Sequence, residues 1–208
     1  MLVDREILAA IKKGTIVIEP FDREALGTNS YDVHLAQTLL TYAPAYEVTK
    51  RARDDDYYGS PPMQTTVEKP LDVREARVTI EHVIGHEGFV LNPGELYLAS
   101  TVEYTESHHH VPILNGKSSL GRLGLSIHVT AGTGDVGFCN HWTMELFVIK
   151  PLRVYAGMPV GQLLWHSTSG GLPLRSYKDK PSAKYGGRDL KPRASEFWRN
   201  FDKAKGDG

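Results

Sequence analysis

The stretch from Gly116 to Glu145 holds the densest set of side chains in this chain that could carry out chemistry. It opens with GKSSLGRLG, in which two serine hydroxyls lie between the cations of Lys117 and Arg122. Backbone N–H groups of a glycine-bounded turn can point at one ligand, and together with hydroxyls and cations they suit phosphate oxygens. No glycine stands at the spacing that a P-loop requires before Lys117. The segment predicts either an anion site or, equally well, a polar turn followed by a short helical turn.

Asp135 is a second candidate, surrounded by glycines in TAGTGDVGF. Glycines permit a tight turn that presents an aspartate and backbone amides inward. Asp135 could then bind a sugar hydroxyl or a metal-bound water. The commoner role of an aspartate in such a turn is to satisfy its own backbone, and the pattern leaves both roles open.

Glu145 is the third candidate, because it lies within the apolar run WTMELFVI. On a strand, alternation places Thr143, Glu145 and Phe147 on one face and Met144 and Leu146 on the other. A carboxylate among apolar neighbours must find a donor or become easier to protonate, which makes Glu145 a candidate general acid and base. The alternative is a glutamate at a strand end that reaches solvent.

The nine histidines do not form a recognisable zinc pattern. His108, His109 and His110 are consecutive, so on a strand they alternate between faces, and in a loop they are simply exposed. The expected helix contains no His-x-x-x-His, and neither Cys-x-x-Cys nor the motif of zinc nucleobase deaminases occurs in the sequence. We therefore expect no catalytic zinc.

Composition limits the class of protein. With 24 basic and 25 acidic residues the net charge is −1, which argues against duplex nucleic acid as a partner. Cys139 is the only cysteine, so no intramolecular disulfide is possible. The start lacks an uninterrupted apolar core, and we expect a cytoplasmic protein. No run of about 18 apolar residues occurs, so we expect no membrane association.

The elements that must position these side chains are mainly strands. Short β-branched or alternating segments, punctuated by Gly, Pro, Asn or Asp, are typical of an antiparallel sandwich or barrel. A short helix capped by Asp4 and stopped by Gly14 should precede them. The expected strands are 15–19, 31–35, 77–80, 89–91, 96–102, 127–130, 143–149, 153–155 and 160–166.

Two segments differ from this pattern. Residues 51–63 (RARDDDYYGSPPM) are polar, charged and proline-rich, and predict an exposed loop. Residues 167–208 are rich in glycine, lysine and arginine and show little periodicity. They predict a flexible C-terminal arm, or lid, that wraps a neighbour or becomes ordered on a ligand, following a single β domain over residues 1–166.

Several blocks, in the right order, resemble the dCTP deaminase family of the dUTPase-like superfamily. They are NSYDVHL from Asn29, KSSLGRLGL from Lys117, HVTA from His128, Asp-x-Gly-Phe from Asp135, TMEL from Thr143, GMPVGQL from Gly157 and AKYGGR from Ala183. The resemblance implies a distorted β-barrel or jelly-roll, a homotrimer, and active sites between subunits. It also implies deamination of dCTP to dUTP without zinc, with Mg²⁺ carried on the triphosphate.

The resemblance also implies a role for each matching residue. Glu145 is the general base and proton shuttle that activates water for attack on cytosine C4. Ser118 and Arg122, with the Ala131 carbonyl, hold that water and stabilise the tetrahedral intermediate. Asp135 binds the deoxyribose 3′-hydroxyl. The remaining substrate-binding residues, most of them directed at the phosphates or the lid, are Lys117, Ser119, Thr143, Gln162, Tyr177, Lys184 and Arg188. The plain dUTPases lack a carboxylate at the position of Glu145, which favours deamination.

The chain departs from the family pattern at several places, among them a short turn at Lys150-Pro151. Lys117 replaces the usual arginine, which keeps the charge but loses a bidentate donor. Arg188 stands where glutamine is usual. The segment 132–134 (Gly-Thr-Gly) replaces bulkier residues and should make that loop smaller and more flexible. Two alternatives follow from these departures: a bifunctional enzyme that releases dUMP and pyrophosphate, and a non-catalytic nucleotide sensor of the same fold.

Overall fold

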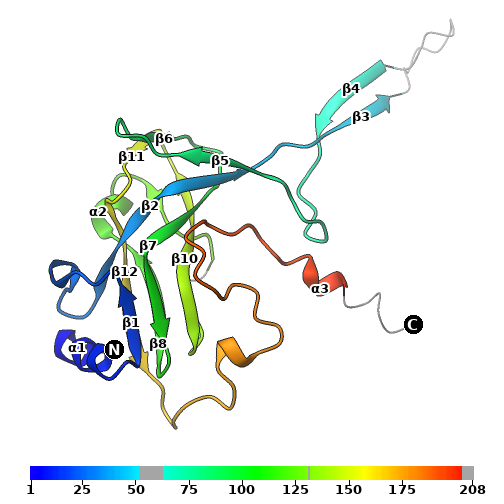
Figure 1. Cartoon of the computed structure of the whole chain (residues 1–208). Coiled ribbons are helices and arrows are strands. Elements are labelled where there is room, and N and C mark those ends of the chain that lie inside the picture. Colours follow the sequence, from blue (N-terminus) through cyan, green and yellow to red (C-terminus); the bar gives the residue numbers. More distant parts are fainter. Residues whose placement is uncertain (52–62, 131, 203–208) are drawn as a thin grey trace, which may run out of the picture. The chain divides into compact units, whose positions relative to one another are not determined.

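The computed structural model describes residues 1–51, 63–130 and 132–202 (Figure 1). The chain forms two compact units. The first consists of Met1–Thr41 and Glu81–Ala194, and the second of Tyr42–Ile80 and Ser195–Gly208. The candidate residues named above all belong to the first unit, so its sheet decides how they are placed.

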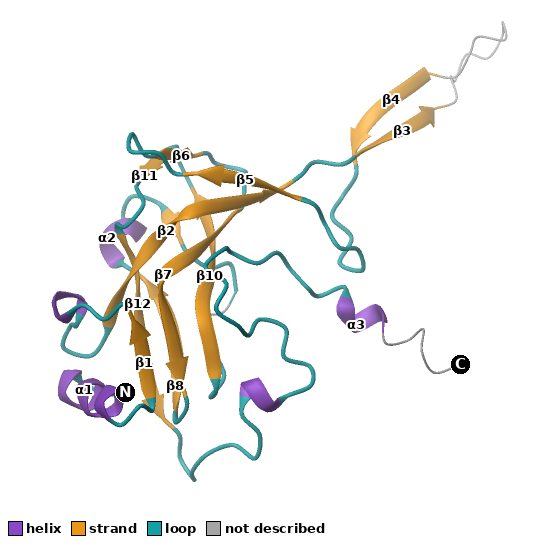
Figure 2. Ribbon diagram, in the orientation of Figure 1, coloured by secondary structure: helices purple, strands orange, loops and turns teal. Residues whose placement is uncertain are grey.

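An antiparallel sheet of eight strands curls into a nearly closed barrel (Figure 2). Its strands follow the path β8-β12-β2-β7-β10-β9, with β1 paired to β7 and β5 paired to β2. The strands are β1 Ile16–Glu19, β2 Tyr31–Tyr42, β5 Thr79–Val83, β7 Tyr97–Ser107, β8 His110–Gly116, β9 Leu125–Ser126, β10 Phe138–Val148 and β12 Pro159–Ser167. A separate two-stranded sheet pairs β6 Phe89–Leu91 with β11 Leu152–Val154. The expectation of a mainly β barrel is confirmed.

Alternation along β10 separates the core from the candidate site. Met144, Leu146 and Val148 are buried, while Thr143 and Glu145 on the opposite face are only partly buried. Burying every second side chain removes apolar surface from water and fixes the register of the strand. Glu145 is thereby held on the non-core face, as the sequence predicted.

The N-terminal helix α1 (Asp4–Lys12) is present, but its cap differs from the prediction. Val3 is the N-cap residue, and its backbone N–H donates to the Glu6 carboxylate at 2.9 Å. Asp4 is already inside the helix and accepts from the N–H of Arg5. Gly14, with a φ of 69°, ends the helix as expected, because this left-handed conformation favours glycine.

One predicted strand was wrong, and the strand β8 was missed. Residues 127–130 form bends instead of a strand, because the Glu145 side chain accepts from the N–H of Val129. The strand β8 was not predicted, since its sequence HVPILNG contains two residues that usually interrupt strands. Pro112 is tolerated there because β8 is at the end of the strand path, where one backbone donor can be missing; its carbonyl accepts from the N–H of Gly134 at 2.8 Å.

The second unit contains a hairpin of β3 (Tyr46–Arg51) and β4 (Met63–Glu68), paired from Tyr46↔Glu68 to Arg51↔Met63. Both strands are polar or charged at many positions, so neither was predicted. The loop expected at 51–63 lies, apart from its two strand-end residues, outside the described part of the chain. The helix α3 (Arg199–Asp202) also belongs to this unit.

Two 3₁₀ helices complete the first unit, η1 (Arg23–Ala25) and η2 (Tyr177–Asp179). The segment around η2 packs on β10 and the turn before it: the N–H of Tyr177 donates to Val136 at 2.8 Å, and the Asn140 side chain donates to the Tyr185 carbonyl at 2.8 Å. In the described ranges, no helix is long and apolar enough to cross a membrane.

Candidate functional site

A cavity of about 490 Å³ opens beside α2 (Ser118–Gly121), the short helix that follows β8. Lys117 precedes the first turn of this helix, so the GKSSLG segment curves around one side of the opening. The segment has the form of a short helical turn, which is one of the two predicted alternatives, and anion binding there stays a prediction. The cavity is lined by Gly116, Lys117, Ser118, Ser119, Gly121, Leu125, Ser126, Ile127, His128 and Gln162.

Lys117 is held at this cavity by an ion pair that the sequence did not predict. Its Nζ lies 2.5 Å from Oδ2 of Asp32, and each side chain is about one-third exposed. Asp32 on β2 is directly opposite Gln162 on β12 in the sheet register. The cavity therefore offers one lysine, one amide, one imidazole and several hydroxyls, with the nearby Asp32 carboxylate already paired.

Ser118 and Arg122 lie together on α2 and its C-cap. The Arg122 guanidinium donates to Ser118 Oγ at 3.3 Å, as expected for residues four apart on a helical turn. The hydroxyl and the guanidinium can thus act on the same small group. Their predicted partnership is consistent with this contact.

Glu145 contacts the polypeptide that lines the cavity. Its Oε2 accepts from the N–H of Val129 at 2.8 Å, and its own N–H donates to the carbonyl of Ile127 at 2.9 Å. The carboxylate makes no hydrogen bond or ion pair with Ser118 or Arg122 among the described residues. Glu145 is thus bonded to the chain, unlike the alternative of a strand-end glutamate that only reaches solvent.

Asp135 lies at a second cavity, of about 460 Å³. Its carboxylate pairs with Lys180 Nζ at 2.9 Å, and both side chains are about half exposed. This cavity is lined by Val111, Thr133, Gly134, Asp135, Val136, Thr168, Ser169, Gly170, Gly171, Leu172, Pro173, Arg175 and Lys180. Within one chain, Asp135 is therefore separate from the cavity beside α2.

The spacing of the two cavities follows from β8. Thr133 forms a bridge with Ile113, and the N–H of Gly134 bonds to Pro112, which places Asp135 near the level of Val111. Lys117 is six residues beyond Val111 along the chain. At about 3.3 Å per residue the two levels are about 20 Å apart.

The segment 132–134 is hydrogen-bonded to β8, and the expectation that it is more flexible stays a prediction. The Gly132 carbonyl accepts from the N–H of Leu114 at 2.7 Å, and the Gly134 N–H donates to β8 as described above. A Cβ on Gly132 would lie 1.9 Å from the Leu114 carbonyl oxygen, and one on Gly134 would lie 2.6 Å from the Trp142 ring. Small residues are needed here because the chain runs directly against β8 and β10.

The other predicted binding residues lie on β10 and the C-terminal segment. Thr143 Oγ1 accepts from the N–H of Arg193 at 3.2 Å. Tyr177 Oη accepts from the N–H groups of Lys184, at 3.3 Å, and Tyr185. None of these residues lines the cavity beside α2 within this chain. Ala131 lies outside the described residues.

Arg188 binds its own chain. Its guanidinium carbon lies 4.0 Å above the Tyr104 ring, and one of its nitrogens lies 3.1 Å from the Glu19 carboxylate. Burial and a hydrogen bond to Glu106 raise the pKa of Tyr104 to about 12, so the phenol is neutral beneath the cation. The structure thus divides the predicted site residues into a group at α2 and a group around Asp135 and the C-terminal segment.

Sequence reasoning missed Asp32 and a cluster of Glu106, His108 and Cys139. Asp32 is part of the NSYDVHL block, where alternation with buried Tyr31 and Val33 could have identified it as facing away from the core. Glu106 and His108 are two residues apart, which on a strand predicts a shared face. Only the pairing of β7 with β10 brings Cys139 to them.

Comparison with known proteins gives a consistent result. The family model described as dCTP deaminase-like matches residues 1–168. A protein of Cytophaga hutchinsonii named "dCTP deaminase, dUMP-forming" is 39% identical over 189 residues, covering 90% of this chain and 91% of the relative. A protein of the same name from Leptospira biflexa serovar Patoc is 37% identical over 204 residues, covering 98% and 99%.

A solved structure supports the fold alone. The 2′-deoxycytidine 5′-triphosphate deaminase from Agrobacterium tumefaciens matches with a TM-score of 0.53 and 18% identity. The match covers 80% of this chain and 48% of the other, so this chain spans about half the length of that protein. The curved β sheet that carries the two cavities is therefore an arrangement seen in a solved structure.

Proposed function

This chain belongs to the dCTP deaminase-like family and is an enzyme of that family, and on this premise we propose that it hydrolyses the 4-amino group of dCTP without zinc. The observation that carries the proposal is the cavity beside α2, where Lys117, Ser118 and Gln162 face a chain segment bonded to Glu145. The names of the relatives support the same substrate.

In the proposed reaction Glu145 acts as the general base. One carboxylate oxygen is fixed by the N–H of Val129, which orients the side chain and leaves the other oxygen free to take a proton from water. The water oxygen bonds to cytosine C4 while Glu145 passes the first water proton to N3. Glu145 then takes the second proton from the C4 hydroxyl and delivers it to the leaving amine, so that C4 keeps its oxygen as a carbonyl. Ammonia departs and a uracil base remains.

Ser118, Arg122 and the Ala131 carbonyl hold the attacking water and the tetrahedral intermediate. The Ser118 hydroxyl and the Arg122 guanidinium already lie within 3.3 Å of each other. Donors that are preorganised around developing charge stabilise the transition state more than the ground state. Their contribution should therefore appear in kcat more than in KM.

The triphosphate is proposed to bind to Lys117, Ser119 and Gln162. The described lining of the cavity contains hydroxyls, an amide and a lysine but no carboxylate. This set fits a Mg²⁺ ion that enters on the phosphates, and it offers no carboxylate cage for the metal. When bound, Mg²⁺ neutralises part of the triphosphate charge.

We propose that the complete site needs a second copy of the chain, in a homotrimer. Asp135 and Lys117 lie at levels of β8 that are about 20 Å apart, too far for one nucleotide to bind both in the same subunit. A strip of exposed apolar side chains around β9 supports an interface there. It consists of Leu123, Val129, Phe147 and Ile149. Asp135, Thr143, Tyr177, Lys184 and Arg188 would then meet the cavity of a neighbour.

The final product is a separate question. The family resemblance predicts dUTP as the product, but the relatives that cover nearly the whole chain are named dUMP-forming. Their names favour a second candidate function, in which the same site also cleaves the α–β phosphoanhydride and releases dUMP and pyrophosphate.

Both functions can be tested with one incubation. The protein is mixed with dCTP and Mg²⁺, ammonia is assayed, and the nucleotides are separated by chromatography. We expect one ammonia per dCTP consumed. If dUMP and pyrophosphate appear together, the second function holds, whereas accumulating dUTP supports deamination alone. Absence of ammonia under conditions where the protein is folded would refute the proposal.

A further inference from the structure

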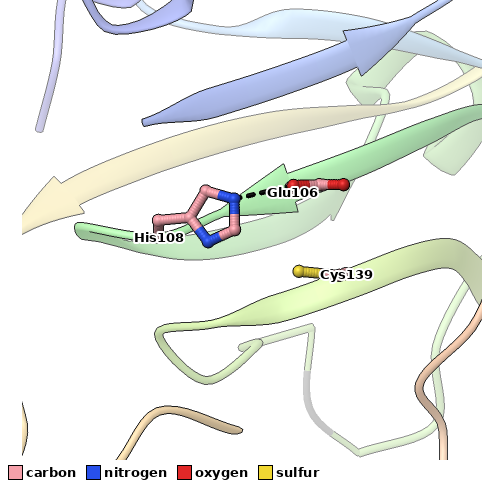
Figure 3. A group of neighbouring side chains, drawn as sticks. All are labelled: Glu106, His108 and Cys139. Carbon is pink, nitrogen blue, oxygen red and sulfur yellow. Dashed lines mark hydrogen bonds and ion pairs between the residues drawn. The ribbon is translucent and has the colours of Figure 1, made fainter. Parts of the chain in front are cut away.

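Three side chains that the proposed deamination does not use lie together where β7 ends beside β10 (Figure 3). A carboxylate oxygen of Glu106, an imidazole nitrogen of His108 and the sulfur of Cys139 all lie within 4.8 Å of one another. Glu106 and His108 are two residues apart, and Cys139 is directly opposite Glu106 on the neighbouring strand. Side chains directly opposite each other on paired strands are neighbours, and the turn after β7 brings His108 to the same two side chains. All three side chains are half-buried.

The Glu106 carboxylate is oriented by its neighbours. Tyr104 Oη donates to Oε1 of Glu106 at 2.8 Å, and Arg188 approaches the same oxygen at 4.0 Å. Oε2 is left facing His108 Nε2 at 2.7 Å. Burial would raise the pKa of Glu106, but the hydrogen bonds from Tyr104 and His108 outweigh burial and hold that pKa below its ordinary value. The cluster therefore has an ionised carboxylate beside an imidazole and a thiol.

This donor set selects a class of metal. Carboxylate oxygen, imidazole nitrogen and thiolate sulfur together suit zinc and related transition metals, whereas Mg²⁺ and Ca²⁺ prefer oxygen alone. Ligands of a tetrahedral zinc ion lie about 3.5 Å from one another. The atoms in this cluster need only small side-chain rotations to reach that spacing. Three protein ligands would leave a fourth position for water.

We propose that Glu106, His108 and Cys139 bind one divalent transition-metal ion of the zinc class. The site is separate from Glu145, because Cys139 lies six residues before Glu145 on β10. At the rise of an extended strand the two residues are about 20 Å apart. The ion links β7 to β10 beneath the C-terminal segment, where the Gly187 N–H donates to the Cys139 carbonyl at 3.3 Å. It has no part in the deamination, which is still expected to need no zinc.

Binding changes protonation in a defined way. The ion takes the place of the proton between Glu106 and His108, so that His108 coordinates through Nε2 and carries its proton on Nδ1. Burial raises the pKa of the Cys139 thiol, so without metal the thiol keeps its proton. Coordination releases that proton to solvent and leaves a thiolate.

Cobalt(II) titration of the full-length, metal-free protein tests the site directly. A thiolate bound to Co²⁺ gives an intense charge-transfer band, and tetrahedral Co²⁺ gives strong visible d–d bands. We expect both bands to saturate at one ion per chain and to disappear when Zn²⁺ is added. Cys139→Ser should abolish the charge-transfer band and weaken Zn²⁺ binding, measured by chelator competition, by at least about tenfold.

Two further variants separate this site from adventitious binding. His108→Gln keeps a donor for Glu106 and should lose the d–d bands, while His109→Ala, at the exposed neighbour, should retain the wild-type titration. Circular dichroism checks that each variant is folded. The proposal is overturned if the folded wild type takes up no stoichiometric Co²⁺, or if Zn²⁺ binds Cys139→Ser and His108→Gln as tightly as it binds the wild type. Neither result depends on turnover of dCTP, so failure here leaves the proposed function untouched.

Discussion

The Glu145 carboxylate accepts a hydrogen bond from the backbone N–H of Val129, 2.8 Å away. Through this bond a side chain on β10 fixes the course of the segment that lines the cavity, and the segment in turn fixes the side chain. The N–H of Glu145 also donates to Ile127. In the proposed reaction Glu145 is the general base, and this mutual bonding would hold it in position before the substrate arrives.

Glu145→Gln should remove deamination while leaving the fold intact. The glutamine amide oxygen can still accept from Val129, but it cannot take a proton from water. We expect kcat to fall by a factor of about 10²–10⁴, with little change in dCTP affinity. Ammonia release and isothermal titration with dCTP measure the two quantities. Glu81→Gln, at an exposed glutamate paired with Lys191, is the matched control. Unchanged turnover in Glu145→Gln would exclude Glu145 as the base.

The position of Glu145 was predictable because alternation along β10 is a local property of the sequence. Buried Met144 and Leu146 fix the face of every residue between them. The course of residues 127–130 was not predictable in the same way. The backbone N–H of Val129 donates to the Glu145 side chain, which is sixteen residues away. A local pattern of β-branched residues does not predict such a contact.

The rest of the candidate site depended on sheet pairing. Lys117 was expected to be a phosphate-binding cation, but its partner Asp32 is 85 residues away and meets it only through the order of the strands. The glycines at 132 and 134 were interpreted as flexibility, which is the usual role of glycine in a loop. Their actual role is close contact with β8 and Trp142, and this could not be known before β8 was recognised.

Two inactive variants should complement each other if each site is shared by two subunits. Ser118→Ala damages the half of the site at α2, and Asp135→Ala damages the other half. After unfolding and refolding a 1:1 mixture, about one quarter of the sites in random trimers combine an intact half from each parent. We expect deamination to rise to about that fraction of the wild-type rate.

The control for this mixture is each variant refolded alone. A mixture no more active than the mean of the separate variants would show that each site is completed within one chain. Sedimentation of the wild type provides an independent measurement of the trimer.

Gly132→Ala should destabilise the first unit. The new Cβ would lie 1.9 Å from the Leu114 carbonyl oxygen, so the backbone of β8 or of residue 132 must move. We expect a loss of about 1–3 kcal/mol in the free energy of unfolding, which corresponds to about 2–4 °C in Tm for each kcal/mol in a chain of this size. Gly85→Ala is the control, because its Cβ would meet no atom within 4 Å. Equal melting temperatures for the two variants would contradict the close approach seen here.

Arg188 should restrain the C-terminal segment in the absence of nucleotide. It stacks on Tyr104 and pairs with Glu19, and both partners lie on its own chain. If the segment is also a lid, Arg188 must leave Glu19 to reach a phosphate, since one guanidinium cannot serve both anions at full strength. Binding of dCTP should then change the exposure of the basic residues between Lys178 and Arg193.

Limited trypsin digestion measures that exposure. We expect Arg188→Ala to be cut in this segment about threefold faster than the wild type without nucleotide, because the cation–π contact is lost. Saturating dCTP should protect the wild type and should protect Arg188→Ala less. Arg5→Ala, on α1, serves as the control for the loss of one arginine. Equal cleavage of the wild type with and without dCTP would exclude the lid, and wild-type cleavage of Arg188→Ala would exclude the restraint.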